Sequence, residues 1–415
     1  MSTNPKQNSK LEVQRSKPSR ATVQDLAASS RVGVKPKIRK STPARPRARY
    51  IMLGGFLGAG KTTAVARLAQ QLTAQGLRVG LITNDQGREL VDTALLRSRG
   101  FATEEIPGGC FCCRFNSLVD AARKLTATAR PDVFIAEPVG SCTDLVATVT
   151  YPLRRMYGDQ FTIAPLSVLV DPARAGRIFG PGPGQKFSGK VIYIYRKQLE
   201  EADLIVINKA DTLSVDQQHE LGRALGETFP GKEIFHVSAR TGKGLEPWFA
   251  RLTSGEQPDG EAMAVDYEVY AEGEALLGWL NCTVRLAAKK PFDGNDFLQA
   301  LAEDLQHRLS KCGAEIAHLK MTLDPDEGLG DLAVINLVRN DFVPELSQTL
   351  EEPLTGGQLI LNLRAEAAPE VLRAAVEAAV AKCGKATPKV VATIEHLEHF
   401  RPGKPQPTHR DLRRA

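Results

Sequence analysis

The chain has 415 residues, of which 42% are hydrophobic and 25% are charged, an ordinary balance for a soluble protein with more than one buried core. No apolar run approaches the ~18 residues that a membrane span needs, and no signal-peptide segment is evident, so we expect a cytoplasmic protein without a membrane partner. Seven cysteines are too few for a disulfide scaffold. The formal net charge of +6 is uneven, because residues 1–49 hold 13 Lys and Arg against two acidic residues.

Residues 1–48 are polar and rich in Ser, Pro, Lys and Arg, without a periodic apolar face. Such a segment cannot bury enough surface to offset the entropy of ordering, which predicts a disordered basic tail. The stretch from Lys35 to Arg49 has the composition of segments that contact nucleic acid, acidic partners or anionic lipid, and it loosely resembles an organelle transit peptide. A solvated tail without a specific ligand is the simpler interpretation, and we expect nucleic-acid binding only through this tail.

Between residues 49 and 253, short apolar runs alternate with helical patterns. Runs of four or five apolar residues bounded by Gly, Asn, Asp or Pro are typical of strands buried on both faces of a parallel sheet. The runs lie at Tyr50–Leu53, Val79–Thr83, Val133–Ala136, Leu166–Val170, Leu204–Ile207 and Ile234–Val237. The alternation predicts a doubly wound, mostly parallel α/β domain over 49–253.

A phosphate-binding motif follows the first of these runs, since residues 55–62 (Gly-Phe-Leu-Gly-Ala-Gly-Lys-Thr) match G-x-x-x-x-G-K-[ST]. Glycines allow backbone N–H groups to converge on phosphates, the Lys reaches the β- and γ-oxygens, and the Thr hydroxyl binds Mg²⁺. An apolar strand before the motif and an amphipathic helix after it favour this interpretation over a glycine-rich turn with an exposed Lys. We therefore expect nucleotide contacts from Gly55, Gly58, Ala59, Gly60, Lys61, Thr62 and Thr63.

Three of the seven cysteines lie within four positions, at Cys110, Cys112 and Cys113. A C-x-C-C arrangement brings soft thiolates close enough to chelate one Zn²⁺ or a similar ion. A structural turn with buried thiols and redox sensing are the alternatives. Cys142 either approaches this site or belongs to the core.

Two later loops, each placed directly after a predicted strand, indicate which base is bound. Asn208-Lys209-Ala210-Asp211 ends in a carboxylate that can accept two hydrogen bonds from guanine, whereas adenine would leave it unsatisfied at a cost of about 1–3 kcal/mol. Ser238-Ala239-Arg240-Thr241-Gly242 matches the loop that offers a backbone N–H to guanine O6. In this order behind a phosphate loop, the two motifs predict GTP, although an Asx-type turn that caps a helix is the structural alternative for the first.

The pattern changes after Thr253–Gly260, a stretch rich in Gly, Pro and acidic residues, and we expect a linker at 254–273. Adjacent strands and two helices predict a smaller α+β domain over 274–400, followed by a second basic tail at 401–415. The expected strands are Leu277–Leu286, Ile316–Leu323, Leu332–Val338 and Gln358–Arg364, and the expected helices are Phe292–Lys311 and Pro369–Lys382.

With these motifs in this order, residues 50–250 resemble the CobW family of P-loop GTPases, which is related to the urease and hydrogenase nickel-insertion GTPases. The resemblance implies Cys112 as the principal metal ligand, with Cys110 and Cys113 beside it, and Asp85 as a switch or metal-side carboxylate. It also implies that Glu137 lies near Mg²⁺ and the attacking water. Asp85 is one methylene shorter than the Glu usual in the family, and Pro138 stands where a hydroxyl residue is usual.

The resemblance implies a GTP-hydrolysing metallochaperone that requires Mg²⁺ and delivers Zn²⁺ or Co²⁺ to a client protein. Lys61, Glu137 and Asp85 are its expected catalytic residues, and a homodimer is left open. The rivals are a regulatory or RNA-associated assembly GTPase with structural cysteines and a small-molecule kinase, and the guanine loop argues against the kinase.

Overall fold

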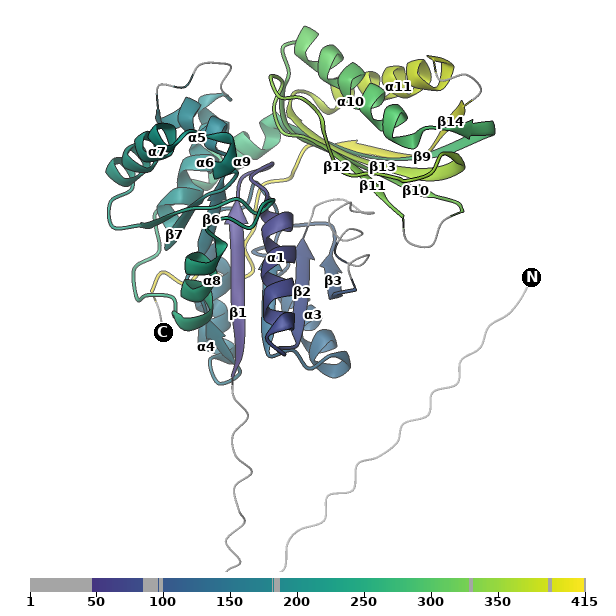
Figure 1. Ribbon diagram of the computed structural model, residues 1–415. Coiled ribbons are helices and arrows are strands. Elements are labelled where there is room, and N and C mark those ends of the chain that lie inside the picture. The colour runs from purple at the N-terminus through teal and green to yellow at the C-terminus, as the bar shows by residue number, and fades with distance from the viewer. Residues whose placement is uncertain are drawn as a thin grey trace, which may run out of the picture. The chain divides into compact units, whose positions relative to one another are not determined.

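The computed structural model describes residues 47–84, 96, 100–180, 182, 187–327, 331–386 and 390–413, which belong to one compact unit. Two sheets organise them, a parallel sheet in the N-terminal half and an antiparallel sheet in the C-terminal half (Figure 1). Among the described residues, none of the helices is both long and apolar enough to cross a bilayer.

The first sheet has eight strands in the order β3-β2-β4-β1-β6-β7-β8, and β5 pairs with β1. Every pairing in it is parallel, as the short, continuously apolar runs predict. Its strands are β1 (Ala48–Gly55), β2 (Val79–Asn84), β3 (Ala102–Ile106), β4 (Val133–Glu137), β5 (Phe161–Ile163), β6 (Ser167–Val170), β7 (Leu204–Ile207) and β8 (Glu233–His236).

Helices pack on both faces of this sheet and bury its two apolar surfaces in separate clusters. Helices α1 and α8 cover one face, and α3, α6 and α7 contribute to the cluster on the other. The helical segments are α1 (Lys61–Ala74), α3 (Phe115–Thr128), η1 (Val146–Thr150), α4 (Tyr151–Tyr157), α5 (Pro172–Phe179), α6 (Gly189–Glu201), η2 (Ala210–Thr212), α7 (Val215–Thr228) and α8 (Leu245–Ser254). The doubly wound α/β prediction is confirmed.

The second sheet is antiparallel, with six strands in the order β12-β11-β10-β13-β9-β14. Helices α10 and α11 cover one face of it and bury a second apolar core there. The elements are β9 (Leu277–Phe292), α10 (Gly294–Lys311), β10 (Glu315–Pro325), β11 (Ala333–Leu337), β12 (Glu345–Gln348), β13 (Leu354–Glu366), α11 (Pro369–Ala386) and β14 (Val390–Phe400). This agrees with the predicted smaller α+β domain, to which β12 and β14 add strands that were not expected.

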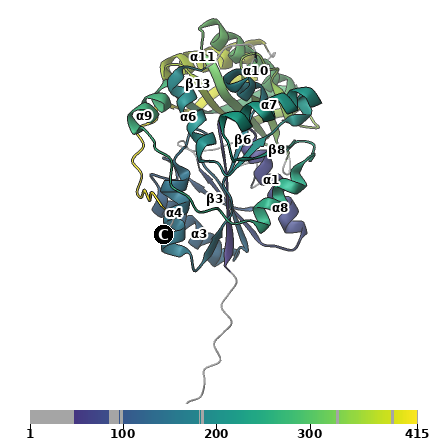
Figure 2. The ribbon, with the colours of Figure 1, turned by 90° about the vertical axis from the view of Figure 1, so that its left-hand side faces the viewer.

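Two segments expected to lack structure are ordered by tertiary contacts. Part of the expected linker 254–273 forms helix α9 (Tyr267–Leu276), which packs against α6. The expected second tail runs past α9 toward α4 (Figure 2), and the Asp411 N–H donates to the Ala147 carbonyl of η1, just before α4, at 2.8 Å. The low apolar content of both segments hides this, because their partners are distant in sequence.

The parallel register brings the functional loops to one edge of the first sheet. Met52 of β1 lies opposite Ala136 of β4, one residue before β4 ends and three residues before β1 ends. Loops after the carboxyl ends of parallel strands converge there, which is where ligands bind in open α/β sheets.

Candidate nucleotide and metal sites

The loop between β1 and α1 is a rigid cradle. Gly55, Gly58 and Gly60 have φ values of 132°, 77° and 90°, which L side chains rarely adopt. A Cβ on Gly55 would come within 2.4 Å of the Leu169 carbonyl oxygen, and one on Gly60 within 2.3 Å of Asn208 Nδ2. No side chain caps the N-terminus of α1 at Gly60, so its backbone N–H groups can bind an anion there.

Lys61, Thr62 and Glu137 meet beyond this cradle, and all three side chains are buried. The Thr62 hydroxyl donates to Glu137 Oε1 at 3.0 Å, and Lys61 Nζ lies 3.5 Å from the carbonyl oxygen of Phe56. A hydroxyl and a carboxylate oxygen are the hard ligands that Mg²⁺ prefers, so this pair fits the ion that the phosphate motif implies. Asp85, the third expected catalytic residue, lies outside the described residues.

The two guanine-type loops are tied to the cradle by hydrogen bonds. Asn208 Nδ2 donates to the Ala59 carbonyl at 2.8 Å, and Asn208 Oδ1 accepts from the Ala239 N–H at 2.9 Å. Lys209 Nζ donates to the Gly58 carbonyl at 2.9 Å, and Ser238 Oγ accepts from the Thr241 N–H at 3.1 Å. A single buried amide therefore holds three loops in register.

These loops line one cavity of about 550 Å³, a volume suited to a small-molecule ligand. Its lining includes most of the residues expected from sequence, namely Gly58, Gly60, Lys61, Thr62, Thr63, Glu137, Asn208, Lys209, Asp211, Ser238 and Ala239. The structure thus brings the phosphate motif and both base motifs to the same cavity.

Asp211 lies at this cavity as an ionised carboxylate. Burial acts to raise its pKa, but hydrogen bonds from Ser238 and Arg240 outweigh burial and lower the pKa below its usual range. Arg240 Nη2 lies 2.7 Å from Asp211 Oδ2, and Arg240 Nη1 lies 2.6 Å from Glu345 Oε1 of β12. The carboxylate expected to recognise guanine is therefore charged and is linked through Arg240 to the C-terminal domain.

The C-terminal domain is joined to the phosphate cradle by a buried arginine that the sequence did not identify. Arg174 of α5 donates to the carbonyl oxygens of Leu57, Ala317 and Val338. A Cβ on Gly58 would come within 2.9 Å of Val338 Cγ1, so β10, β11 and the cradle are in close contact.

Asp171 adds an ionic layer to this junction. It forms ion pairs with Lys209 at 2.8 Å and with Arg339, which follows β11, at 3.0 Å. Burial acts to raise the Asp171 pKa, but Lys209, Arg174 and Arg339 hold it well below its usual range. The carboxylate is thus charged at the boundary between the two domains.

The three clustered cysteines lie in a turn between β3 and α3. Their Sγ atoms are 2.8 Å (Cys110 to Cys112), 3.2 Å (Cys110 to Cys113) and 3.6 Å (Cys112 to Cys113) apart. All three fall within 4.8 Å of one another, and the thiols are free. Three thiols this close together can reach a single metal ion, which thiolates usually bind tetrahedrally.

The thiols differ in acidity because they bond to one another. Hydrogen bonds from Cys112 and Cys113 lower the pKa of Cys110 well below its usual value. The same contact with Cys110, together with burial, raises the pKa of Cys112 well above it, and the contact raises the pKa of Cys113 to about 11. Cys110 is therefore the most acidic of the three thiols, and Cys112 and Cys113 are the less acidic ones.

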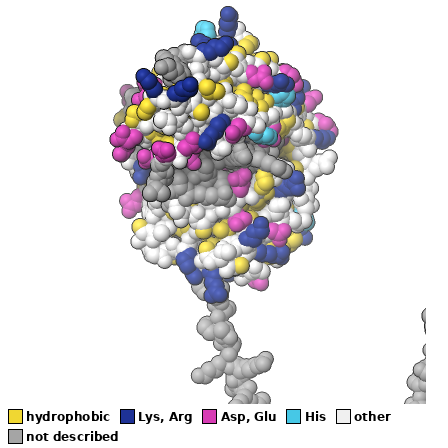
Figure 3. All heavy atoms as spheres, turned by 90° about the vertical axis from the view of Figure 1, so that its right-hand side faces the viewer, with side chains coloured by type: hydrophobic (Ala, Val, Ile, Leu, Met, Phe, Trp, Pro, Cys, Tyr) yellow, Lys and Arg dark blue, Asp and Glu magenta, His cyan; other side chains and the backbone are white. Residues whose placement is uncertain are grey.

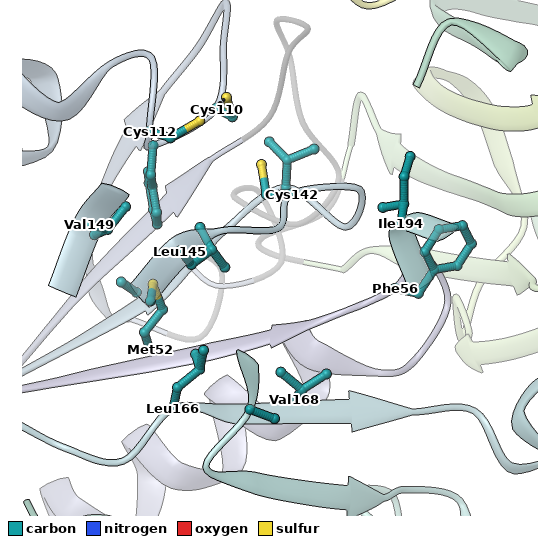
Figure 4. Packing of buried hydrophobic residues seen from close by; sticks show 14 of the residues in the cluster. Met52, Phe56, Cys110, Cys112, Cys142, Leu145, Val149, Leu166, Val168 and Ile194 are labelled. Atoms are coloured by element: carbon teal, nitrogen blue, oxygen red, sulfur yellow. Dashed lines mark hydrogen bonds between the residues drawn. The ribbon is translucent and has the colours of Figure 1, made fainter. Parts of the chain in front are cut away.

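Cys142 and Glu274 complete the surroundings of the cluster. Cys142, on the loop after β4, lies in the same apolar cluster as Cys110 and Cys112 (Figure 4), and burial raises its pKa well above the usual value. Glu274 of α9 lines a cavity of about 290 Å³ with Cys110 and Cys113, and it accepts from the Ser141 hydroxyl at 2.6 Å. Burial, followed by the charge of Cys110, raises the Glu274 pKa to about 8. The sequence offered no signal for Glu274, because it is far from the cysteines along the chain.

The C-terminal segment covers this turn. The Gln406 N–H donates to Cys113 Sγ at 3.2 Å, and the Thr408 N–H donates to the Cys112 carbonyl at 2.8 Å. Arg410 forms an ion pair with the buried Asp144 at 2.7 Å. The segment that the sequence predicts to be a basic tail therefore forms part of the surroundings of the thiols.

A parallel sheet, a glycine cradle and two base loops define a P-loop nucleotide-binding protein. Residues 49–236 match the model of the nucleotide-binding domain of CobW/HypB/UreG proteins. This part of the chain is therefore similar to the nucleotide-binding domain of the CobW/HypB/UreG proteins.

Curated proteins are also similar to part of this chain. The zinc chaperone YeiR of Escherichia coli (strain K12) is 26% identical over 192 residues, which cover 45% of this chain and 53% of that protein. The zinc chaperone CobW of Sinorhizobium sp is 32% identical over 184 residues, which cover 39% of this chain and 51% of that protein. The matches thus span about half the length of these relatives. Zn(II)-bound YjiA GTPase from E. coli is 15% identical, with a TM-score of 0.34, over 80% of this chain and 98% of that chain.

Proposed function

We propose that this chain binds and hydrolyses GTP, that it binds Zn²⁺ or Co²⁺ at Cys110, Cys112 and Cys113, and that it passes the metal to a client protein. The family and the names of the curated relatives support a nucleotide-binding metallochaperone. The choice between the two metals, the delivery step and a cytoplasmic setting are our inference.

One side chain supports coupling between the two sites. Asn84, at the end of β2, lines the nucleotide cavity. Its Nδ2 also donates to the carbonyl oxygens of Ile106 at 2.8 Å and Gly109 at 2.6 Å, just before Cys110. A change at the phosphate end of the cavity can thus alter the cysteine turn, and metal affinity and nucleotide affinity would then be linked reciprocally.

In the proposed reaction the protein contributes position and charge. The cradle amides and Lys61 would hold the phosphates, and Thr62 and Glu137 would hold Mg²⁺, which supplies charge neutralisation when bound. Glu137 would orient a water molecule, and its carboxylate at the cavity wall beside Thr62 supports this role. Asn208, Asp211 and Ala239 would select guanine.

The test is equilibrium titration of the reduced protein with Zn²⁺ and with Co²⁺, in the presence of GDP, of a non-hydrolysable GTP analogue, or of neither. Cys112→Ser is the test variant. Cys312→Ser is the matched control, because Cys312 is an exposed cysteine at the C-terminal end of α10 and does not belong to the cysteine turn. We expect tight, nucleotide-dependent binding that is lost in Cys112→Ser and kept in Cys312→Ser. Binding that is indifferent to both nucleotides would contradict the coupling.

The assembly-GTPase alternative treats the cysteines as structural. Their burial in an apolar cluster is compatible with it. On the face drawn in Figure 3, acidic and basic side chains of the described residues are interspersed, so that face is not a basic nucleic-acid surface. Salt-dependent RNA binding that disappears on deletion of residues 1–48 would favour this alternative.

A further inference from the structure

The face of the second sheet that is turned away from α10 and α11 forms one wall of the nucleotide cavity. Leu319 and Met321 of β10 are buried in the core beneath those helices. Since successive side chains of a strand point to opposite faces, His318 and Lys320 project from the other face, and both line the cavity.

Lys320 reaches the phosphate end of the cavity. Its Nζ lies 3.4 Å from the hydroxyl oxygen of Thr62, the last residue of the phosphate motif. In the sheet, Lys320 is flanked by Asn336 of β11 and Asn362 of β13, which are its register partners. A half-buried lysine thus lies beside the hydroxyl expected to hold Mg²⁺, with an asparagine in register on each neighbouring strand.

Contacts between the two domains fix the position of strand β10, which carries Lys320, next to the cradle. Arg174 bonds to the carbonyl oxygens of Leu57 in the cradle and of Ala317 in β10. Because Ala317 and Lys320 belong to the same strand, this buried guanidinium joins the strand that carries Lys320 to the cradle. The second cation on this wall, Arg364, donates to the Leu280 carbonyl and to Asn281, and it packs on the Trp279 ring at 4.0 Å. Arg364 is thus bonded to its own sheet, which leaves Lys320 as the cation of this wall directed at the cradle among the described residues.

We propose that Lys320, supplied by the C-terminal domain, binds the terminal phosphate of GTP and makes the site prefer GTP to GDP. This role rests on the proposed GTP site and adds a recognition residue to it. GTP carries about one more negative charge than GDP, so an ammonium at the phosphate end gains more from the triphosphate. The C-terminal domain would thereby sense which nucleotide is bound.

The experiment measures the affinities of GDP and of a non-hydrolysable GTP analogue in Mg²⁺ for the full chain and three variants. Lys320→Met removes the charge, Lys320→Arg keeps it, and Lys290→Met is the matched control, an exposed lysine on strand β9 of the same sheet. Thermal unfolding of each variant is measured in parallel, so that a folding defect is detected separately.

We expect Lys320→Met to weaken the GTP analogue by about 10-fold or more, as loss of a hydrogen bond to a charged group does, and to weaken GDP much less. Lys320→Arg should restore most of the difference, and Lys290→Met should behave as wild type. Equal weakening of both nucleotides, or no change, would overturn the role of Lys320 and leave the GTP site intact. Absence of guanine-nucleotide binding in the wild type would instead overturn the proposed function.

Discussion

At the nucleotide cavity, the groups expected from sequence lie in short loops at one edge of the first sheet. The cavity beside the thiols is lined instead by the cysteine turn, helix α9 and residues 402–405 of the C-terminal segment. The first site depends on backbone geometry, with three left-handed glycines and N–H groups at the start of α1. The second depends on side chains whose protonation is set by their neighbours. The comparison shows that a short stretch of sequence can determine a phosphate site. The surroundings of a thiol cluster, in contrast, depend on segments that only the tertiary structure brings together.

The largest expected effect is a loss of GTP hydrolysis without a change in metal binding. Lys61→Ala should reduce GTP hydrolysis by about 10²- to 10³-fold, because it removes the cation of the phosphate motif while the fold remains intact. Zn²⁺ affinity without nucleotide should be unchanged. Phosphate release and metal titration measure the two effects, with Lys124→Ala on the exposed side of α3 as control. Wild-type turnover in Lys61→Ala would refute the phosphate site.

Cys112→Ser should weaken metal binding and leave nucleotide binding nearly unchanged. Serine is not deprotonated near neutral pH and replaces a soft donor with a hard one, so Zn²⁺ affinity should fall by about 10- to 100-fold or more. GTP affinity should stay within a few fold of wild type. Competition with a chromogenic chelator compares this variant with Cys110→Ser and Cys113→Ser, and we expect Cys112→Ser to be the most severe. Undiminished binding in the triple serine variant would place the metal elsewhere.

Asp211→Asn should alter base preference and leave metal binding unchanged. The amide presents a donor where guanine also presents one, so GTP affinity should fall by about 10-fold or more relative to xanthosine triphosphate. Asp216→Asn, in the first turn of α7, is the control. If the order of preference among GTP, ATP and xanthosine triphosphate does not change, Asp211 does not contact the base.

The smallest expected effect is the change of metal affinity with each pH unit. Hydrogen bonding raises the pKa of Cys113 to about 11, and the pKa of Cys112 is also raised, so both thiols are protonated at neutral pH. Zn²⁺ must displace these protons, and its apparent affinity should rise by up to about tenfold per pH unit for each proton released. Chelator competition between pH 6.5 and 8, with proton release measured in weak buffer, tests this sign. An affinity that does not change with pH would mean that the thiols are not the ligands.

Much of the nucleotide site was predictable because its determinants are contiguous. The glycine spacing of residues 55–60 demands the left-handed conformations that the structure shows. Apolar runs bounded by turn residues located the strands that precede both base loops. The prediction for Asp85 remains open, since it lies outside the described residues, and the roles of Glu137 and Thr63 remain predictions.

The sequence by itself determined the parallel sheet, the phosphate cradle, the guanine-type loops and the triplet of clustered cysteines. These depend on local conformation and on strand periodicity, which short-range patterns encode. Tertiary structure alone decided that Arg174 joins the cradle to β10, that Glu274 and the C-terminal segment adjoin the thiols, and that Lys320 faces Thr62. Each of these contacts joins residues at least 100 positions apart. Folding buries these polar groups, and a buried polar group then needs a hydrogen-bonding partner from elsewhere in the chain, which short-range sequence patterns do not reveal.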